Sequence, residues 1–373
     1  MLDSPSLGWT VLAFIALLGP LVFFHELGHY LVGRWCGIGA QVFSIGFGRE
    51  IFGWTDKRGT RWKIGWLPLG GYVQFMGDED AVSTPHEVTR DEPAGSFAAA
   101  VLWKRSATVA AGPIANFLLA IVILTGFALA YGKMTTPPVA SMVQQGSPAD
   151  TAGITPGDRI VSVDGRAMTT FQDIPMAVMH RPGEAMDFVV DRGGRQMTLR
   201  IAPTIVREND SFGNPVERAI IGIRPGAISF EAVGVAQAPI VATTMAWSIT
   251  RQMAEVIGQL LTGQRSIKDM GGPLKIAQVS GQQASLGIAP FLYFAALISL
   301  NLGFVNLLPM PMLDGGHLLF NAVEAVRRRP VSVPSQQMAF RFGFAAMITL
   351  MIVVTFNDLS SFGLWQKLAG LIG

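Results

Sequence analysis

The stretch Phe23-Phe24-His25-Glu26-Leu27-Gly28-His29-Tyr30 decides how this sequence is interpreted. It has the form H-E-x-x-H. Residues four apart lie on one face of a helix, so His25 and His29 can bind a single metal ion. Neutral imidazole is a common ligand of zinc, and a catalytic zinc site keeps one position for water. Glu26 is therefore the expected general base that takes a proton from that water.

The motif lies at the end of an uncharged, mostly apolar run, Leu7–Phe24. A run of this length predicts a transmembrane helix, and Pro20 is expected to kink it one turn before the histidines. Ionisable side chains at the end of a membrane span are costly and are uncommon without a function. We therefore favour a metal site over the alternative, a pair of interfacial histidines that face lipid headgroups.

The composition is typical of an integral membrane protein. Of the 373 residues, 50% are hydrophobic and 14% are charged, and the mean hydropathy is +0.40. The net charge of +2 gives no argument for nucleic acid. Cys36 is the single cysteine, which excludes an internal disulfide and a cysteine-based zinc cluster. Because Asp3 is the only charge before the first apolar run, we expect a retained span and not a removed signal peptide.

Apolar runs and turn residues predict eight segments. They are a first transmembrane helix (1–35), a cytoplasmic-side loop with a membrane-associated hairpin (36–105), a second transmembrane helix (106–132), a domain of short strands and turns (133–226), extracytoplasmic amphipathic helices (227–287), a third transmembrane helix (288–317), a cytoplasmic loop (318–338), and a fourth transmembrane helix with the C-terminal tail (339–373). The uncharged run 232–250 is rich in Ala, Thr, Ser and Gln, which favours a helix lying on the membrane surface.

Four local patterns refine this division. Arg61–Trp66 alternates polar and apolar side chains, and together with the following Leu67–Phe75 it predicts a hairpin of short strands. A second hairpin is expected from Met186–Val190 and Gln196–Ile201, and a short helix from Phe171–His180. The last apolar run, Phe342–Asn357, is short for a bilayer core of about 30 Å, so preceding residues or local thinning of the bilayer must help it to span.

The distribution of positive charge predicts the topology. The first loop contains Lys and Arg at nine positions, and Arg327–Arg329 with Arg341 lie between the third and fourth runs. The positive-inside rule then places both termini and the 133–226 domain outside, and the H-E-x-x-H motif near the cytoplasmic side.

A zinc site with two histidines needs a third protein ligand, and Asp314 is the strongest candidate. With four spans, the first and third run in the same direction, so His29 and Asp314 end near the same membrane face. If 232–250 also crossed, Asp314 would lie on the opposite face. Glu50 and His317 remain weaker alternatives.

Two asparagines are candidates for stabilising the substrate or the transition state. Asn306 lies two helical turns before Asp314 and can donate a hydrogen bond to the oxyanion of a tetrahedral intermediate. Asn116 lies within the second apolar run. For both residues an interhelical hydrogen bond is the alternative.

The motif His25–His29 together with Asn306-Leu307-Leu308-Pro309…Asp314-Gly315 resembles the site-2 protease family of intramembrane zinc metalloproteases, most closely its bacterial RseP type. Ala111–Asn116 resembles the second-span motif of that family. Leu69–Val73 resembles its membrane-associated β-hairpin, which implies that the substrate adds as a strand at Gly70, Gly71, Tyr72 and Val73. Residues 146–203 are similar to a single bacterial PDZ domain, with Gly153 and Ile154 near its carboxylate-binding loop, whereas the best-known members carry two such domains.

The resemblance implies a polytopic α-helical membrane protein with about four transmembrane helices, a membrane-associated β-hairpin and an inserted extracytoplasmic PDZ-like α+β domain. It implies an endopeptidase of the bacterial inner membrane that uses one Zn²⁺ held by His25, His29 and Asp314. The implied substrates are single-span membrane proteins, such as anti-sigma factors and remnant signal peptides, within the lipid bilayer and without nucleic acid. Two alternatives are a non-proteolytic PDZ-containing membrane scaffold and an ion transporter.

Overall fold

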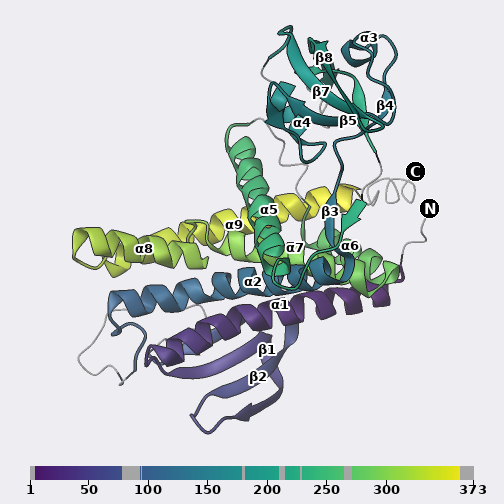
Figure 1. The fold of residues 1–373 in the computed structure, drawn as a ribbon. Coiled ribbons are helices and arrows are strands. Elements are labelled where there is room, and N and C mark those ends of the chain that lie inside the picture. The colour runs from purple at the N-terminus through teal and green to yellow at the C-terminus, as the bar shows by residue number, and fades with distance from the viewer. Residues whose placement is uncertain are drawn as a thin grey trace, which may run out of the picture. The chain divides into compact units, whose positions relative to one another are not determined.

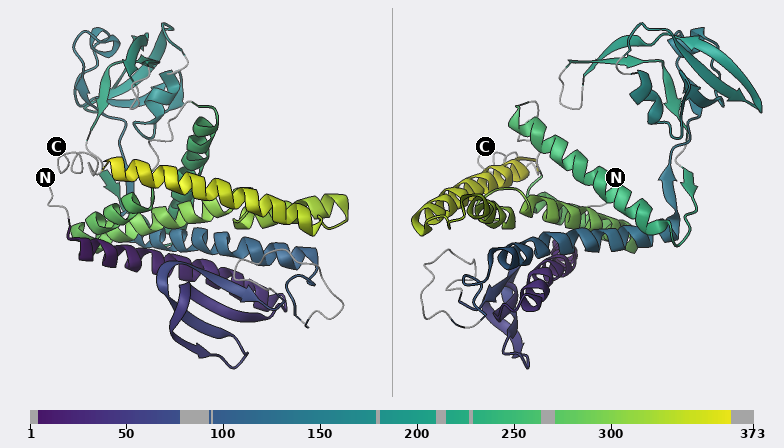
Figure 2. Two further views of the ribbon diagram at one scale, coloured as in Figure 1. Left: turned by 180° about the vertical axis from the view of Figure 1, so that it is seen from behind. Right: turned by 60° about the vertical axis from the view of Figure 1, so that its left-hand side comes forward.

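The computed structural model describes residues 5–77, 93, 95–178, 181–209, 215–226, 229–263 and 271–361. The chain forms two compact units. The first consists of Met1–Gly126 with Pro239–Gly373, and the second is Phe127–Ala238. Figures 1 and 2 show the long helices of the first unit and the strands of the second. The end of the predicted helix, His180, lies outside the described residues.

Four helices of the described residues are long and apolar enough to cross a membrane. They are α1 (Leu7–Trp35), α2 (Leu102–Tyr131), α7 (Ile288–Asn306) and α9 (Val333–Ser361). Their number agrees with the four predicted spans, and the chain is a multi-pass membrane protein. The helices α1 and α2 pack closely because Gly28 has no side chain: a methyl group there would collide with the carbonyl oxygen of Ala111.

In the last third of the chain, two helices have other bounds than those predicted. The third span ends at Asn306, and a separate helix, α8 (Asp314–Arg327), extends into the segment 318–338 that was expected to be a loop. The fourth helix begins at Val333, earlier than predicted, because Pro334 is compatible with a first helical turn. The candidate span, Val333–Phe356, extends for about 36 Å at 1.5 Å per residue. Residues before Phe342 therefore lengthen the helix, as the short apolar run had led us to expect.

Two further helices, α5 (Ala238–Leu261) and α6 (Pro273–Leu286), complete the first unit. Neither is among the four candidate spans. On α5, the small residues Ala242 and Ala246 are buried in a cluster with residues of α2 and α7, whereas Trp247 is exposed. This two-sided character agrees with the amphipathic helix predicted for 232–250.

The hairpin after α1 differs from the prediction. Residues 61–75 form one continuous strand, β2 (Arg61–Phe75), which pairs antiparallel with β1 (Ala40–Thr55). The glycines of β1 hide its strand pattern: Gly46 and Gly48 both have φ of +85° and accompany irregularities in the strand register. Figure 1 shows the hairpin beside α1. Phe43 of β1 packs on Tyr30 of α1, which fixes the hairpin against the helix.

The second unit is built around the sheet β6-β5-β7-β8. Its elements are β3 (Lys133–Thr135), β4 (Ala140–Val143), α3 (Pro148–Thr151), β5 (Arg159–Val163), β6 (Arg166–Ala167), α4 (Asp173–Val178), β7 (Met186–Arg192), β8 (Arg195–Ile201), β9 (Thr204–Asn209), β10 (Pro215–Ile220), β11 (Ile223–Pro225) and β12 (Ser229–Glu231). The predicted hairpin is confirmed as β7–β8. The core of the second unit is centred on Phe188, Ile160 and Ile174.

Candidate metal centre

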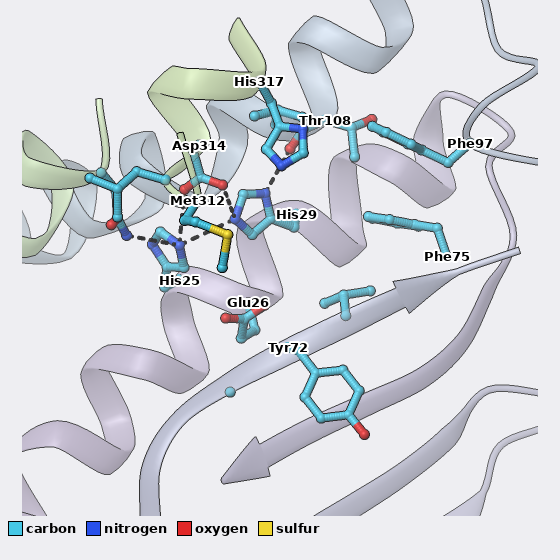
Figure 3. Close-up of a pocket in the computed structure, with 15 residues that line it drawn as sticks. His25, Glu26, His29, Tyr72, Phe75, Phe97, Thr108, Met312, Asp314 and His317 are labelled. Carbon is cyan, nitrogen blue, oxygen red and sulfur yellow. Dashed lines mark hydrogen bonds and ion pairs between the residues drawn. The ribbon is translucent and has the colours of Figure 1, made fainter. Parts of the chain in front are cut away.

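Helix α1 presents both histidines on one face, as the spacing of four residues requires. The Nε2 atoms of His25 and His29 lie 3.2 Å apart. Both side chains are buried. Figure 3 shows the two rings directed toward Asp314.

Asp314 reaches the histidines because α7 stops at Asn306 and the chain turns before α8 begins. Met312, in this turn, has φ of +80°, a strained conformation for a residue with a side chain. Gly315 and Gly316 follow, and a methyl group at either would collide with carbonyl oxygens of the same turn. The backbone 307–316 is therefore folded tightly on itself, and it holds Asp314 at the first position of α8.

The three side chains fit a zinc ion. Asp314 Oδ2 lies 3.2 Å from His25 Nε2, and Asp314 Oδ1 lies 3.5 Å from His29 Nε2. A tetrahedral zinc ion with bonds of about 2.0–2.1 Å separates its ligand atoms by about 3.3 Å. Asp314 Oδ2 is also buried and accepts no hydrogen bond from the described residues, so a cation would satisfy it. Within the described ranges, His25, His29 and Asp314 are the group of three suited to hold a metal.

Helix α2 supports both histidines from behind. The Nδ1 atom of His29 lies 2.9 Å from the carbonyl oxygen of Thr108. The Nδ1 atom of His25 lies 3.0 Å from Nδ2 of Asn116. Between these two positions Gly112 faces the ring of His29, where a methyl group would collide with Nε2. The sequence did not indicate the contacts of Thr108 and Gly112, because a backbone carbonyl and an absent side chain carry no motif of their own.

The remaining member of the motif, Glu26, lies beside strand β2. A methyl group added to Gly71 would be 3.0 Å from Glu26 Cγ, so only glycine fits here without displacing one of them. Glu26 lines a cavity of about 220 Å³ together with Gly71, Tyr72 and Val73 and with the three candidate ligands. Figure 3 shows Glu26 between the histidines and the strand that carries Tyr72. The carboxylate is thus placed between the candidate metal site and an extended backbone. Gly70, with φ of +95°, precedes this segment.

The other candidates from the sequence separate into two groups. Asn306 and His317 line the same cavity. Asn306 Nδ2 lies 3.2 Å from His25 Nε2, and the ring of His317 packs at 5.0 Å from that of Phe340. Asn116 is fully buried and is not among the residues that line the cavity. Glu50 is ion-paired with Arg61 on the hairpin, away from the three-residue group.

The second unit has a cavity of its own, of about 350 Å³. It is lined by α4, by Met142 of β4 and by residues 219–224, which run from the end of β10 into β11. Gly153 and Ile154 do not line it. The carbonyl oxygen of Gly153 accepts a hydrogen bond from Arg192, and Ile154 belongs to the hydrophobic core. The predicted peptide-binding role of these two residues therefore gains no support from this cavity.

The comparison with known proteins agrees with the geometry of the candidate metal site. A family model described as peptidase family M50 matches residues 13–350. A protein of Agrobacterium fabrum named "Putative zinc metalloprotease" is 46% identical over 360 residues, which cover 94% of this chain and 96% of the relative. The "Metalloprotease MmpA" of Caulobacter vibrioides is 35% identical over 390 aligned residues, which cover 97% of this chain and 98% of the relative.

Among solved structures, the PDZ domain of an SdrC-like protein from Listeria monocytogenes is similar to part of this chain. The aligned region covers 25% of this chain and 90% of that domain. The identity is 23% and the TM-score is 0.19. A likeness of this size does not establish the fold of the second unit.

Proposed function

The chain belongs to peptidase family M50, and we propose that it cuts single-span membrane proteins within or near their transmembrane segments. It is a zinc metalloprotease of that family, and four apolar helices make it a multi-pass membrane protein. One observation carries the proposal further. His25, Glu26, His29 and Asp314 converge on a cavity near the end of an apolar helix, and one wall of that cavity is strand β2.

The chemistry assigns a role to each side chain. A zinc ion held by His25, His29 and Asp314 would act as a Lewis acid toward water and the scissile carbonyl. Glu26 accepts the proton of the attacking water and donates it to the leaving amine. Asn306 lines the same cavity, so its side-chain N–H can donate a hydrogen bond to the carbonyl oxygen as negative charge develops there.

Strand β2 would present the substrate to this site. Gly71, Tyr72 and Val73 line the cavity beside Glu26. A substrate that adds as a further strand here must unwind, and an unwound backbone exposes its peptide bonds to attack. This mode suits a single-span helix better than a folded soluble protein.

We propose the bacterial inner membrane as the location, with the site near the cytoplasmic side. The basic residues of the first loop and of Arg327–Arg329 support this orientation. The proposed substrates are anti-sigma factors and remnant signal peptides in the lipid bilayer. The second unit, which resembles a PDZ domain in sequence, would bind part of the substrate outside the membrane.

The test is cleavage of a single-span model protein by the purified full chain in detergent, with bound zinc measured for each variant. Glu26→Gln should keep its zinc and lose activity by about 10²–10⁴-fold, which is the usual contribution of a general base. Glu255→Gln is the matched control, because Glu255 is exposed on α5 and pairs only with exposed Arg251 among the described residues.

Mass spectrometry of the products locates the cut. A cut far from the transmembrane segment would contradict the proposed substrate position. Full activity of Glu26→Gln would contradict its role as the base. Zinc binding without cleavage of any single-span protein would favour the non-proteolytic scaffold.

A further inference from the structure

We propose that Asn116 is a positioning residue whose side-chain carbonyl oxygen accepts a hydrogen bond from Nδ1–H of His25. This bond would fix the tautomer in which Nε2 of His25 is free to bind zinc. The inference rests on the proposed zinc site, and it assigns Asn116 to the metal centre instead of to the substrate.

Asn116 is held rigidly between three helices. It lies on α2 and is fully buried. Its side-chain amide lies 3.0 Å from Nδ1 of His25 on α1. Its backbone carbonyl accepts a hydrogen bond of 2.8 Å from the hydroxyl of Ser299 on α7. A side chain held in this way can fix the orientation of an imidazole ring.

The direction of the hydrogen bond follows from the needs of His25. If Asn116 donates from Nδ2 to Nδ1, the neutral ring carries its proton on Nε2, which then cannot bind a metal. A rotation of the amide by 180° exchanges its nitrogen and oxygen within the same space. The carbonyl oxygen then accepts from Nδ1–H, and Nε2 is left with a free lone pair.

The second histidine makes a similar hydrogen bond through Nδ1, and the direction of that bond is certain. Nδ1 of His29 lies 2.9 Å from the carbonyl oxygen of Thr108, which can only accept. Nδ1 of His29 must therefore carry a proton, and in the neutral ring Nε2 then has a free lone pair. Metal-binding histidines usually donate their other N–H to an oxygen in this way. On α2, Thr108 and Asn116 would supply one such oxygen to each histidine.

The location of Asn116 separates this role from transition-state stabilisation. Asn116 contacts His25 through Nδ1, whereas Asp314 and Asn306 contact the same ring through Nε2. Asn306 lines the cavity and Asn116 does not. Asn116 can therefore act on the reaction only through His25.

The experiment measures zinc affinity of the purified full chain by competition with a chelator. Asn116→Ala should bind zinc about 10–100-fold more weakly, the usual loss when a partner of a metal-binding histidine is removed. Asn116→Asp should stay close to wild type, because aspartate has the same shape and keeps the acceptor oxygen but has no N–H to donate. Ser299→Ala is the control, since it removes a hydrogen bond to Asn116 without changing the side chain that faces His25.

Each result decides between the explanations. Loss of affinity in Asn116→Asp as large as in Asn116→Ala would overturn the proposal, because it would mean that the amide acts as a donor. Equal losses in Ser299→Ala and Asn116→Ala would overturn it in favour of helix packing, as would equal affinities in Asn116→Ala and wild type. If Asn116→Ala does not fold, Asn116→Asp alone decides. Absence of tight zinc binding in wild type would instead contradict the proposed function.

Discussion

At the scale of single residues, the metal centre depends on small side chains as much as on its ligands. Gly112 of α2 lies against Nε2 of His29, the atom that would bind zinc, and Gly71 of β2 lies against Glu26. Each glycine lets another backbone element approach a functional side chain closely. The ligand positions are therefore defined by contacts at residues with no chemistry of their own.

The first prediction concerns Gly112→Ala. The added methyl group would collide with the ring of His29, so zinc affinity should fall at least 10-fold in a chelator competition assay. Alanine favours a helix over glycine by about 1 kcal/mol, so weakening of α2 would not explain the loss. Gly126→Ala on the same helix is the control, because nothing lies within 4 Å of its added methyl group. Equal affinity in the two variants would mean that His29 can move away without cost.

At the scale of elements, each unit is fixed by polar contacts between elements distant in sequence. In the second unit, Asp158 accepts hydrogen bonds from Nε of Arg192 at 2.7 Å and from the N–H of Thr155 at 2.8 Å. Its side chain is 1% exposed. These contacts join the turn before β5 to the end of β7, and the hydrogen bonds from Arg192 hold the pKa of the Asp158 carboxyl below its usual range.

This lowered pKa predicts how stability depends on pH. A carboxylate with a lowered pKa in the folded state stabilises the fold above its ordinary pKa of about 3.9, and this stabilisation is lost as the pH falls through the lower folded value. At pH 7, Asp158→Asn should therefore speed hydrogen exchange in β5 and β7 of the full chain. The difference from wild type should shrink below about pH 4, after correction for intrinsic exchange rates.

Glu184→Gln is the matched control for that comparison. Glu184 pairs with Arg181 at the surface, where an ion pair contributes little. A pH-independent difference between Asp158→Asn and wild type would show that the ionised carboxylate is not what stabilises the turn.

At the scale of the whole molecule, the site depends on two spans that run in the same direction. His25 lies in the C-terminal half of α1, and Asn306 is the last residue of α7. The two side chains meet at 3.2 Å. For His25 and Asp314 to lie near the same membrane face, the chain between the hairpin and Asp314 must cross the membrane an even number of times. The helices α2 and α7 account for two crossings.

The matching prediction uses single cysteines in a chain whose Cys36 is replaced by alanine. Lys57→Cys in the β1–β2 turn and Arg329→Cys after α8 should react with an impermeant maleimide only after spheroplasts are opened. Arg195→Cys in the second unit should react in intact spheroplasts. All three positions are exposed, so access depends on the side of the membrane. Labelling of Lys57→Cys and Arg329→Cys from opposite sides would mean that α5 or α6 also crosses.

Features that depend on short spacing were predictable before the structure was known. Three of these features are local patterns: the four-residue interval of His25 and His29, the helix-breaking residues before Asp314, and the uncharged runs of the four spans. The β7–β8 hairpin was predicted for the same reason, since alternation and a Gly-Gly turn lie within one short stretch. Such patterns reflect helix and strand geometry and hydrophobic burial, which neighbouring residues already fix.

The tertiary structure alone decided the features that join distant segments. Three such features link residues far apart in sequence. They are the pairing of β2 with β1, the contact of Gly112 with His29, and the contact of Asn116 with His25. A buried asparagine has the same local pattern whether it joins two helices or orients a ligand. The difference arises only when packing of α1 on α2 brings Nδ1 of His25 within hydrogen-bonding distance of Asn116.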